Sequence, residues 1–168
     1  MQKCWLKIIP KLLGESGLNL LIIFAWIAVF SFLAIFRYVC FYEAESHFIY
    51  IDGTKLVRPY SSFEGPSFQE IDLGILFLSG LIGGFLLKDF EKVLFGLIKA
   101  GFLSFLTDVV YASFFIWFAL GFKEFAAVNF FIALEWTVFY AVLNFVRILP
   151  MGLIPLFLGA IITCFVLA

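Results

Sequence analysis

Residues 93–146, VLFGLIKAGFLSFLTDVVYASFFIWFALGFKEFAAVNFFIALEWTVFYAVLNFV, decide the fold of this chain. The stretch consists of two long apolar runs, 93–120 and 125–146, on either side of a polar turn, GFKE at 121–124. Each run reaches the roughly 20 apolar residues that a helix needs to cross a bilayer. The stretch therefore predicts two neighbouring membrane-spanning helices joined by a short turn.

Each of these two predicted helices contains an acidic residue, Asp108 in the first and Glu135 in the second. Counted from a turn centred near Phe122, Asp108 is 14 residues back and Glu135 is 13 residues on. The two carboxyl groups are therefore expected at nearly the same depth, near the bilayer midplane. A carboxylate there costs roughly 2.5 to 3.5 kcal/mol, so it faces the protein interior, takes a partner or marks a pathway. Two arrangements are open: one site that shares a proton or binds a cation, or two separate structural or inter-subunit contacts.

The whole chain has the composition of a membrane protein. Of its 168 residues, 64% are hydrophobic and 14% are charged, and its mean hydropathy is +1.12, whereas soluble domains are about 25% charged. We expect one membrane domain, residues 1–168, in contact with the lipid bilayer. The net charge of −1 provides no basic face for nucleic acid, and Cys4, Cys40 and Cys164 form no CxxC motif. Recognisable catalytic motifs are absent as well, so we expect neither an enzyme nor a cofactor.

Further apolar runs bring the expected number of membrane spans to five. The predicted spans are about 18–41, 73–87, 93–120, 125–146 and 151–168. Residues 1–17 precede the first span and alternate three lysines with apolar side chains, so they are predicted to form an amphipathic segment at the membrane interface, broken by Pro10 and ended by Gly14 and Gly17. Arg147 and Pro150 are expected to end the fourth span. The predicted fold is an all-α bundle of five transmembrane helices.

A long polar stretch, residues 43–69, separates the first two spans and is expected on the exterior side. Within it, FIYI at 48–51 and TKLV at 54–57 flank an Asp-Gly dipeptide. Asp-Gly favours the type I′ turn of a two-residue hairpin because both turn positions need positive φ. We therefore expect a small exterior β-hairpin.

Three potential metal ligands, Glu43, Glu45 and His47, alternate just before this hairpin. In a strand all three would project from one face, which makes them a weak candidate for a hard-metal site. A solvated strand explains the same pattern. One histidine is too few for a dedicated transition-metal site, so we expect no metal.

Small residues on the second and third spans predict close helix packing. Gly80 and Gly84 form a GxxxG motif on the second span, and Gly96 and Ala100 repeat the spacing on the third. Such motifs let two helix backbones approach closely. We expect the second and third spans to pack on one another, with homo-oligomerisation as the alternative.

Polar side chains form a stripe on each of the third and fourth spans. At 100° per residue, one narrow arc of the third span holds Ser104, Thr107, Asp108 and Tyr111. The corresponding stripe on the fourth span consists of Asn129, Ala133, Thr137, Tyr140, Asn144 and Arg147. Lys99 lies opposite Asp108 and can reach the membrane interface, and Glu135 points away from the stripe on its own helix. A helix with two such faces belongs in the centre of a bundle or between two chains.

The distribution of basic residues predicts the orientation. With the N-terminus inside, the inner segments carry six lysines and arginines against four outside, which favours a cytoplasmic N-terminus and an external C-terminus in a cell membrane. Two functions fit these features. The first is a subunit or scaffold of a larger membrane assembly, bound to other membrane chains or to a second copy. The second is a channel or transporter for a cation, proton or small solute that uses the mid-membrane carboxylates.

Overall fold

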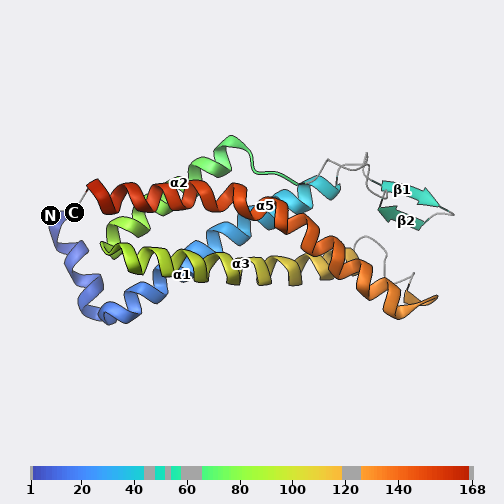
Figure 1. Cartoon of the computed structure of the whole chain (residues 1–168), viewed down its shortest axis with the longest axis horizontal. Coiled ribbons are helices and arrows are strands. Elements are labelled where there is room, and N and C mark those ends of the chain that lie inside the picture. The colour runs from blue at the N-terminus through green and yellow to red at the C-terminus, as the bar shows by residue number, and fades with distance from the viewer. Residues whose placement is uncertain (1, 44–47, 52–53, 58–65, 119–125, 167–168) are drawn as a thin grey trace.

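The computed structural model describes residues 2–43, 48–51, 54–57, 66–118 and 126–166. Within these ranges, four helices are long and apolar enough to cross a membrane. They are α1 (Gln2–Glu43), α2 (Glu70–Leu87), α3 (Phe90–Phe118) and α5 (Phe130–Val166). The helices run along the long axis of an elongated bundle (Figure 1). By the length and composition of these helices, the chain is a multi-pass membrane protein.

The prediction of five spans is wrong because the predicted fourth and fifth spans form one continuous helix. This helix, α5, has 37 residues and contains Arg147, Pro150 and Pro155 in its interior. Membrane helices tolerate proline because neighbouring helices and local adjustments satisfy the freed backbone groups. A reversal at this point would need a polar connection, and the surrounding residues are apolar apart from Arg147. One long helix is therefore formed instead of two short ones.

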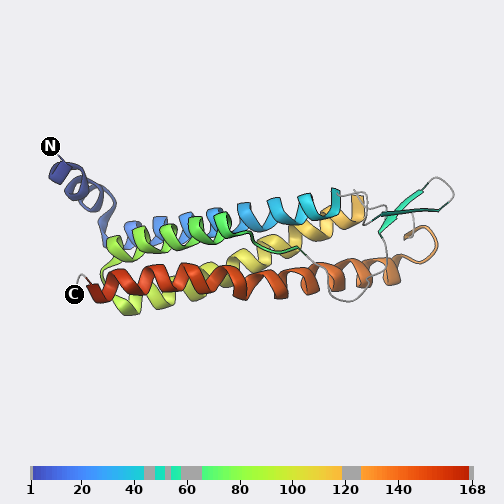
Figure 2. The ribbon, with the colours of Figure 1, turned by 90° about the horizontal axis from the view of Figure 1, so that it is seen from above.

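The two ends of the helical chain lie together. The start of α1 and the end of α5 are at the same end of the bundle in Figures 1 and 2. With four spans, the predicted placement of the N- and C-termini on opposite sides of the membrane is wrong. We call this end the termini end and the opposite one the hairpin end.

The first residues do not form an element of their own. α1 continues from Gln2 through Pro10 and Gly14 to Glu43, and its candidate membrane span is Ser16–Phe41. The first turns of α1 diverge from the axis of the bundle (Figure 2). The predicted amphipathic segment 1–17 is therefore helical from Gln2 and continuous with the first membrane helix, and its location at the membrane interface stays a prediction.

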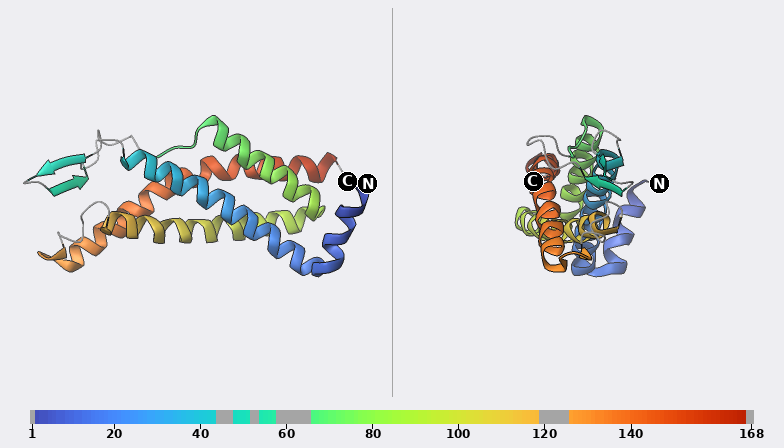
Figure 3. Two further views of the ribbon diagram at one scale, coloured as in Figure 1. Left: turned by 180° about the vertical axis from the view of Figure 1, so that it is seen from behind. Right: turned by 90° about the vertical axis from the view of Figure 1, so that its right-hand side faces the viewer.

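A pair of short strands lies at the hairpin end. Strand β1 (Phe48–Ile51) pairs antiparallel with β2 (Thr54–Val57), with Phe48 opposite Val57 and Ile51 opposite Thr54. The dipeptide between them, 52–53, is outside the described residues. The strands project beyond the helices, at the same end as the start of α5 (Figure 3).

The most extensive helix contact joins α2 to α5, and glycines form it. A Cβ atom on Gly80 would collide with the carbonyl oxygen of Leu156 and lie 3.0 Å from the Ala160 nitrogen. A Cβ on Gly84 would meet the Ala160 carbonyl oxygen, and one on Gly159 would meet the backbone of α2. The close approach that the GxxxG motif predicts therefore exists, but its partner is α5. The expected pairing of the second and third spans is wrong.

α1 is held against α2 and α3 by Trp26. The Trp26 indole N–H donates a hydrogen bond to the Ser79 carbonyl oxygen of α2 at 3.1 Å. On α3, a Cβ on Gly96 would lie 3.1 Å from the Trp26 ring, so this glycine makes room for the indole of α1. Ala100, one turn further on, is buried. The small residues predicted on the third span thus line a contact with the first helix.

Candidate functional site

The relative depth of Asp108 and Glu135 follows from the register of α3 against α5. The rings of Trp117 and Phe130 have centroids 5.7 Å apart, and the site of a Cβ on Gly101 lies 3.1 Å from the Leu153 side chain. In this antiparallel register Asp108 is level with residues 139–146 of α5. Glu135 therefore lies 4 to 11 residues, or roughly 6 to 16 Å, nearer the hairpin end. The predicted match in depth is wrong because Phe130, at the start of α5, already lies opposite Trp117.

Asp108 is the centre of a buried polar cluster. Its relative exposure is 0%, and neither carboxyl oxygen has a hydrogen-bond partner among the described residues. The Ser31 hydroxyl of α1 faces this carboxyl group, and Ser104 precedes Asp108 by one turn on the same face of α3. Within the described ranges, both hydroxyl groups are buried without a hydrogen-bond partner. Buried polar groups are rarely left unsatisfied, so this cluster, Asp108, Ser31 and Ser104, is the first candidate site.

Other polar groups lie inside the bundle near this level. The Tyr38 ring of α1 packs against Phe115 and Phe145, with centroids 5.5 Å away in each case. Thr137 is buried and donates to the Ala133 carbonyl oxygen of its own helix at 2.7 Å. Asn144 is also fully buried.

The remaining predicted polar residues lie nearer the surface. Tyr140 is half-buried, and the exposed ones are Lys99, Thr107, Tyr111, Asn129 and Arg147. The predicted stripe on 129–147 is therefore exposed at both ends, at Asn129 and Arg147, and buried between them, at Ala133, Thr137 and Asn144.

Glu135 is exposed on α5. Within the described ranges no hydrogen bond or ion pair involves its side chain. Because Asp108 is enclosed between α1 and α3 while Glu135 faces outward, the two carboxyl groups do not form one site. This separation removes the geometric basis for a shared proton or a shared cation.

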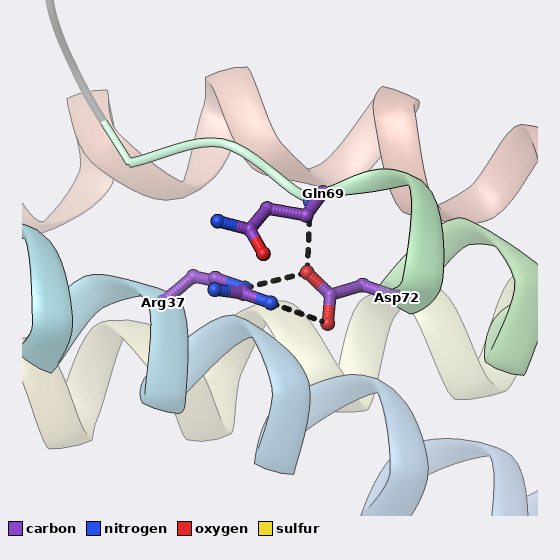
Figure 4. A network of polar contacts seen from close by, with 3 residues as sticks. All are labelled: Arg37, Gln69 and Asp72. Carbon is purple, nitrogen blue, oxygen red and sulfur yellow. Dashed lines mark hydrogen bonds and ion pairs between the residues drawn. The ribbon is translucent and has the colours of Figure 1, made fainter.

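An ion pair between α1 and α2 was not predicted from the sequence (Figure 4). Arg37 donates from Nε to Asp72 Oδ2 at 2.5 Å and from Nη2 to Oδ1 at 3.0 Å. The backbone N–H of Gln69 donates to the same Oδ2 at 2.8 Å, so Asp72 also caps α2. Asp72 is only 2% exposed. The available signal was a basic residue at the end of one span and an acidic residue at the start of the next.

An apolar cavity of about 260 Å³ opens between α3 and α5. Leu97, Pro150 and Leu153 are among its lining residues, all of which are apolar. The cavity is therefore separate from the carboxyl group of Asp108. In a membrane helix pair, such a surface suits an apolar chain rather than an ion.

The predicted metal ligands cannot be placed as a group. Glu45 and His47 lie outside the described residues, and Glu43 is the last residue of α1. In the part of the chain that the structure describes, no three His, Cys, Asp or Glu side chains gather in a way that could hold a metal ion. The candidate sites are therefore the buried cluster around Asp108 and the exposed Glu135.

Comparison with known proteins gives no further assignment. No family model, no curated protein and no solved structure matches the chain. Function is therefore inferred from the geometry alone.

Proposed function

We propose that this small polytopic membrane protein acts as a subunit or scaffold of a larger membrane assembly. The observation that carries the proposal is the length of α5 along which apolar side chains are exposed. Phe131 and Phe165, at its two ends, are 79% and 74% exposed, and they are 34 residues apart. That separation corresponds to about 51 Å of helix, whereas the hydrocarbon core of a bilayer is about 30 Å thick. A partner protein would cover the part that lipid tails leave exposed.

The charged turn between α2 and α3 indicates which part of α5 extends beyond the hydrocarbon core. Lys88, Asp89, Glu91 and Lys92 are all exposed there, at the termini end, and charged side chains belong outside the hydrocarbon core. The excess apolar length is then at the hairpin end. The exposed aromatic side chains of α3 and α5 at this end, which we call the tip surface, are Tyr111, Phe114, Phe118, Phe130, Phe131, Trp136 and Phe139. Aromatic residues are enriched at the centres of protein interfaces, which supports a partner at this surface.

The same charges support an orientation in a cell membrane. The lysines of the α2–α3 turn lie at the same end as the N-terminal lysines, and basic residues favour the cytoplasmic side. We therefore propose that the termini end is cytoplasmic and that the tip surface lies at the exterior face. Accessibility of an epitope tag at the N-terminus in intact cells tests this orientation.

Native mass spectrometry of the full chain, extracted together with its lipid by a styrene–maleic acid copolymer, tests the subunit proposal. We expect a stoichiometric complex with one or more further polypeptide chains. Phe131→Ser at the tip surface should dissociate it, because an aromatic anchor is lost at the interface. Ile154→Ser, a matched control at an exposed position further along α5, should leave the complex intact. A functional monomer for the wild-type chain would overturn the proposal.

A channel or transporter for a proton, cation or small solute is the second candidate function. It is favoured by one observation, the buried carboxyl group of Asp108 without a hydrogen-bond partner among the described residues. Ion flux into proteoliposomes should then fall by at least about tenfold in Asp108→Asn, because the only change is at the carboxyl group. Glu135→Gln serves as the control, since Glu135 lies on a different surface, and its flux should be unchanged. Equal flux in wild type and Asp108→Asn would exclude this function.

A further inference from the structure

The apolar cavity between α3 and α5 is a groove that opens on the surface of the bundle. Its lining residues lie in the ranges 94–98 of α3 and 150–157 of α5. They include Leu97, which is buried, and Ile98 and Ile154, which are exposed. In a membrane protein such a surface faces lipid, so the groove is accessible to an acyl chain from the bilayer.

The contact between α2 and α5 defines the depth of Arg147 in the bilayer. An added Cβ on Gly84 would meet atoms of residues 160 and 163, so Lys88, four residues later on α2, is level with 164–167 of α5. Lys88 belongs to the charged turn outside the hydrocarbon core. Arg147 precedes that level by 17 to 20 residues, or about 26 to 30 Å of helix. Because the core is about 30 Å thick, Arg147 lies at its other boundary.

The ion pair between Arg37 and Asp72 marks the same boundary. An added Cβ on Gly80 would meet atoms of residues 156 and 160, so Asp72, eight residues earlier on α2, is level with 148–152 of α5. Charged groups are costly inside the hydrocarbon core. A charged pair at this level therefore agrees with a boundary near Arg147, and the groove starts there.

Arg147 lies at the hairpin end of the groove. It is seven residues from Ile154, which places the two side chains within about 20° of one another around α5. Side chains of a helix tilt toward its N-terminus, and α5 begins at the hairpin end, so Arg147 is directed toward the lipid headgroups. The lining range 150–157 extends 3 to 10 residues from Arg147 toward the bilayer centre, or about 5 to 15 Å. One leaflet of the core is about 15 Å thick, so the groove has the length of one acyl chain.

We propose that this groove binds one glycerophospholipid from the leaflet at the hairpin end, with an acyl chain along the groove and the phosphate at Arg147. The apolar lining suits the chain. A guanidinium group suits the phosphate because it can donate two parallel hydrogen bonds to it. The site needs the depth given by the charged turn, but it does not need the partner protein of the proposed function. Either proposal can therefore fail alone.

Native mass spectrometry of the purified full chain in detergent tests this site with defined lipids. The probe is dioleoylphosphatidylglycerol, and the control with the same chains is dioleoylglycerol, which lacks the phosphate. We expect one phosphatidylglycerol to bind more tightly than any further one. Dioleoylglycerol should bind at least about tenfold more weakly, because it cannot accept a hydrogen bond from a charged group at the phosphate position. Glycerol phosphate, which lacks the chains, should not bind at the same concentration.

Two variants separate the headgroup contact from the chain contact. Arg147→Gln should weaken the binding of phosphatidylglycerol about tenfold and leave that of dioleoylglycerol unchanged. Lys92→Gln, which removes a basic group at the termini end, should leave both unchanged. Leu94→Trp adds a large ring to the groove lining and should weaken both lipids at least about fivefold. Leu103→Trp, the same substitution at an exposed position on the opposite face of α3, should weaken neither.

Unchanged binding of phosphatidylglycerol in Arg147→Gln would overturn the phosphate contact, and unchanged binding in Leu94→Trp would overturn the groove as the place of the chain. Several lipids bound with equal affinity would replace the site by a nonspecific lipid shell. Unchanged helical circular dichroism shows that a variant is folded. Photolabelling of the wild type needs no variant: phosphatidylglycerol with a diazirine midway along one acyl chain should label residues within 94–98 or 150–157. Labelling only outside these ranges would overturn the proposal.

Discussion

The contact between α2 and α5 makes opposite predictions for two glycines of one helix. At Gly80 an added Cβ meets the Leu156 carbonyl oxygen and the Ala160 backbone, which cannot rotate away as a flexible side chain can. At Gly74, six residues earlier on α2, an added Cβ has no atom within 4 Å. Gly80→Ala and Gly74→Ala therefore make the same chemical change in the same helix, and only the first one disturbs packing.

The expected difference between the two variants is a few kcal/mol. Alanine favours a helix over glycine by about 1 kcal/mol, so Gly74→Ala should raise the free energy of unfolding by up to that amount. Overpacking a close contact costs typically about 1 to 3 kcal/mol. Because the added Cβ meets backbone atoms, Gly80→Ala should be in the upper part of that range, about 2 to 3 kcal/mol. After the gain in helix propensity, it should lower the free energy of unfolding by about 1 to 2 kcal/mol. Gly159→Ala, the reciprocal change on α5, should do the same because its Cβ meets the Phe77 carbonyl oxygen.

Reversible unfolding in mixed detergent and dodecyl sulfate micelles, followed by circular dichroism, measures these differences. Wild type and the three variants are compared at the same micelle composition, so that the slopes of their transitions can be matched. The α2–α5 contact would be refuted if Gly80→Ala and Gly74→Ala shifted the transition in the same direction by equal amounts. It would also be refuted if Gly159→Ala proved neutral, because both helices must lose the same close approach.

Polar groups inside the bundle give three further predictions. Arg37→Ala leaves the buried Asp72 carboxylate unpaired and should cost about 3 kcal/mol of stability. Arg37→Leu combined with Asp72→Asn should recover most of this loss in the same unfolding assay. Equal losses in the single and the double variant would contradict the ion pair's role. Asp108→Leu removes a buried carboxyl group without a hydrogen-bond partner in the described chain and should raise the stability by about 1 kcal/mol or more; a loss in thermal denaturation would reveal an undetected partner. Trp26→Phe removes the hydrogen bond to Ser79 and should cost about 1 to 2 kcal/mol, and an unchanged unfolding midpoint would argue against that bond.

The sequence identified the membrane class of the protein, but the number of spans required the structure. The apolar run that ends at 166 is long enough for two short spans or one long one, and hydropathy does not separate these cases. Arg147 and Pro150 favoured a break between a fourth and a fifth span. Inside a bundle, however, a proline costs little when neighbouring helices satisfy the backbone, and a break without polar residues would leave carbonyl groups in lipid.

Packing partners were equally hard to assign from sequence. Gly80 and Gly84 correctly indicated a close contact, because only a missing Cβ allows two backbones to touch. The motif does not say which helix approaches, since every span offers apolar side chains and small residues. In a soluble bundle each helix has one polar face, which would reduce the number of helices that could pack against the motif. Here the complement, Gly159 with Ala160, was visible in the sequence only as two small residues in an apolar run.

The two carboxyl groups show why counting residues from a turn does not define a site. The count assumed that both helices leave the turn symmetrically, but Phe130 already lies opposite Trp117, which moves Glu135 toward the hairpin end. The count also carried no information about how each helix is rotated about its own axis. These rotations place Asp108 inside the bundle and Glu135 on its surface. Their energetic roles must therefore differ. Asp108 affects the packing of α1 on α3, so its replacement should change the stability of the isolated chain. Glu135 is exposed and makes no hydrogen bond or ion pair within the described chain, so its replacement should leave the stability of the isolated chain unchanged.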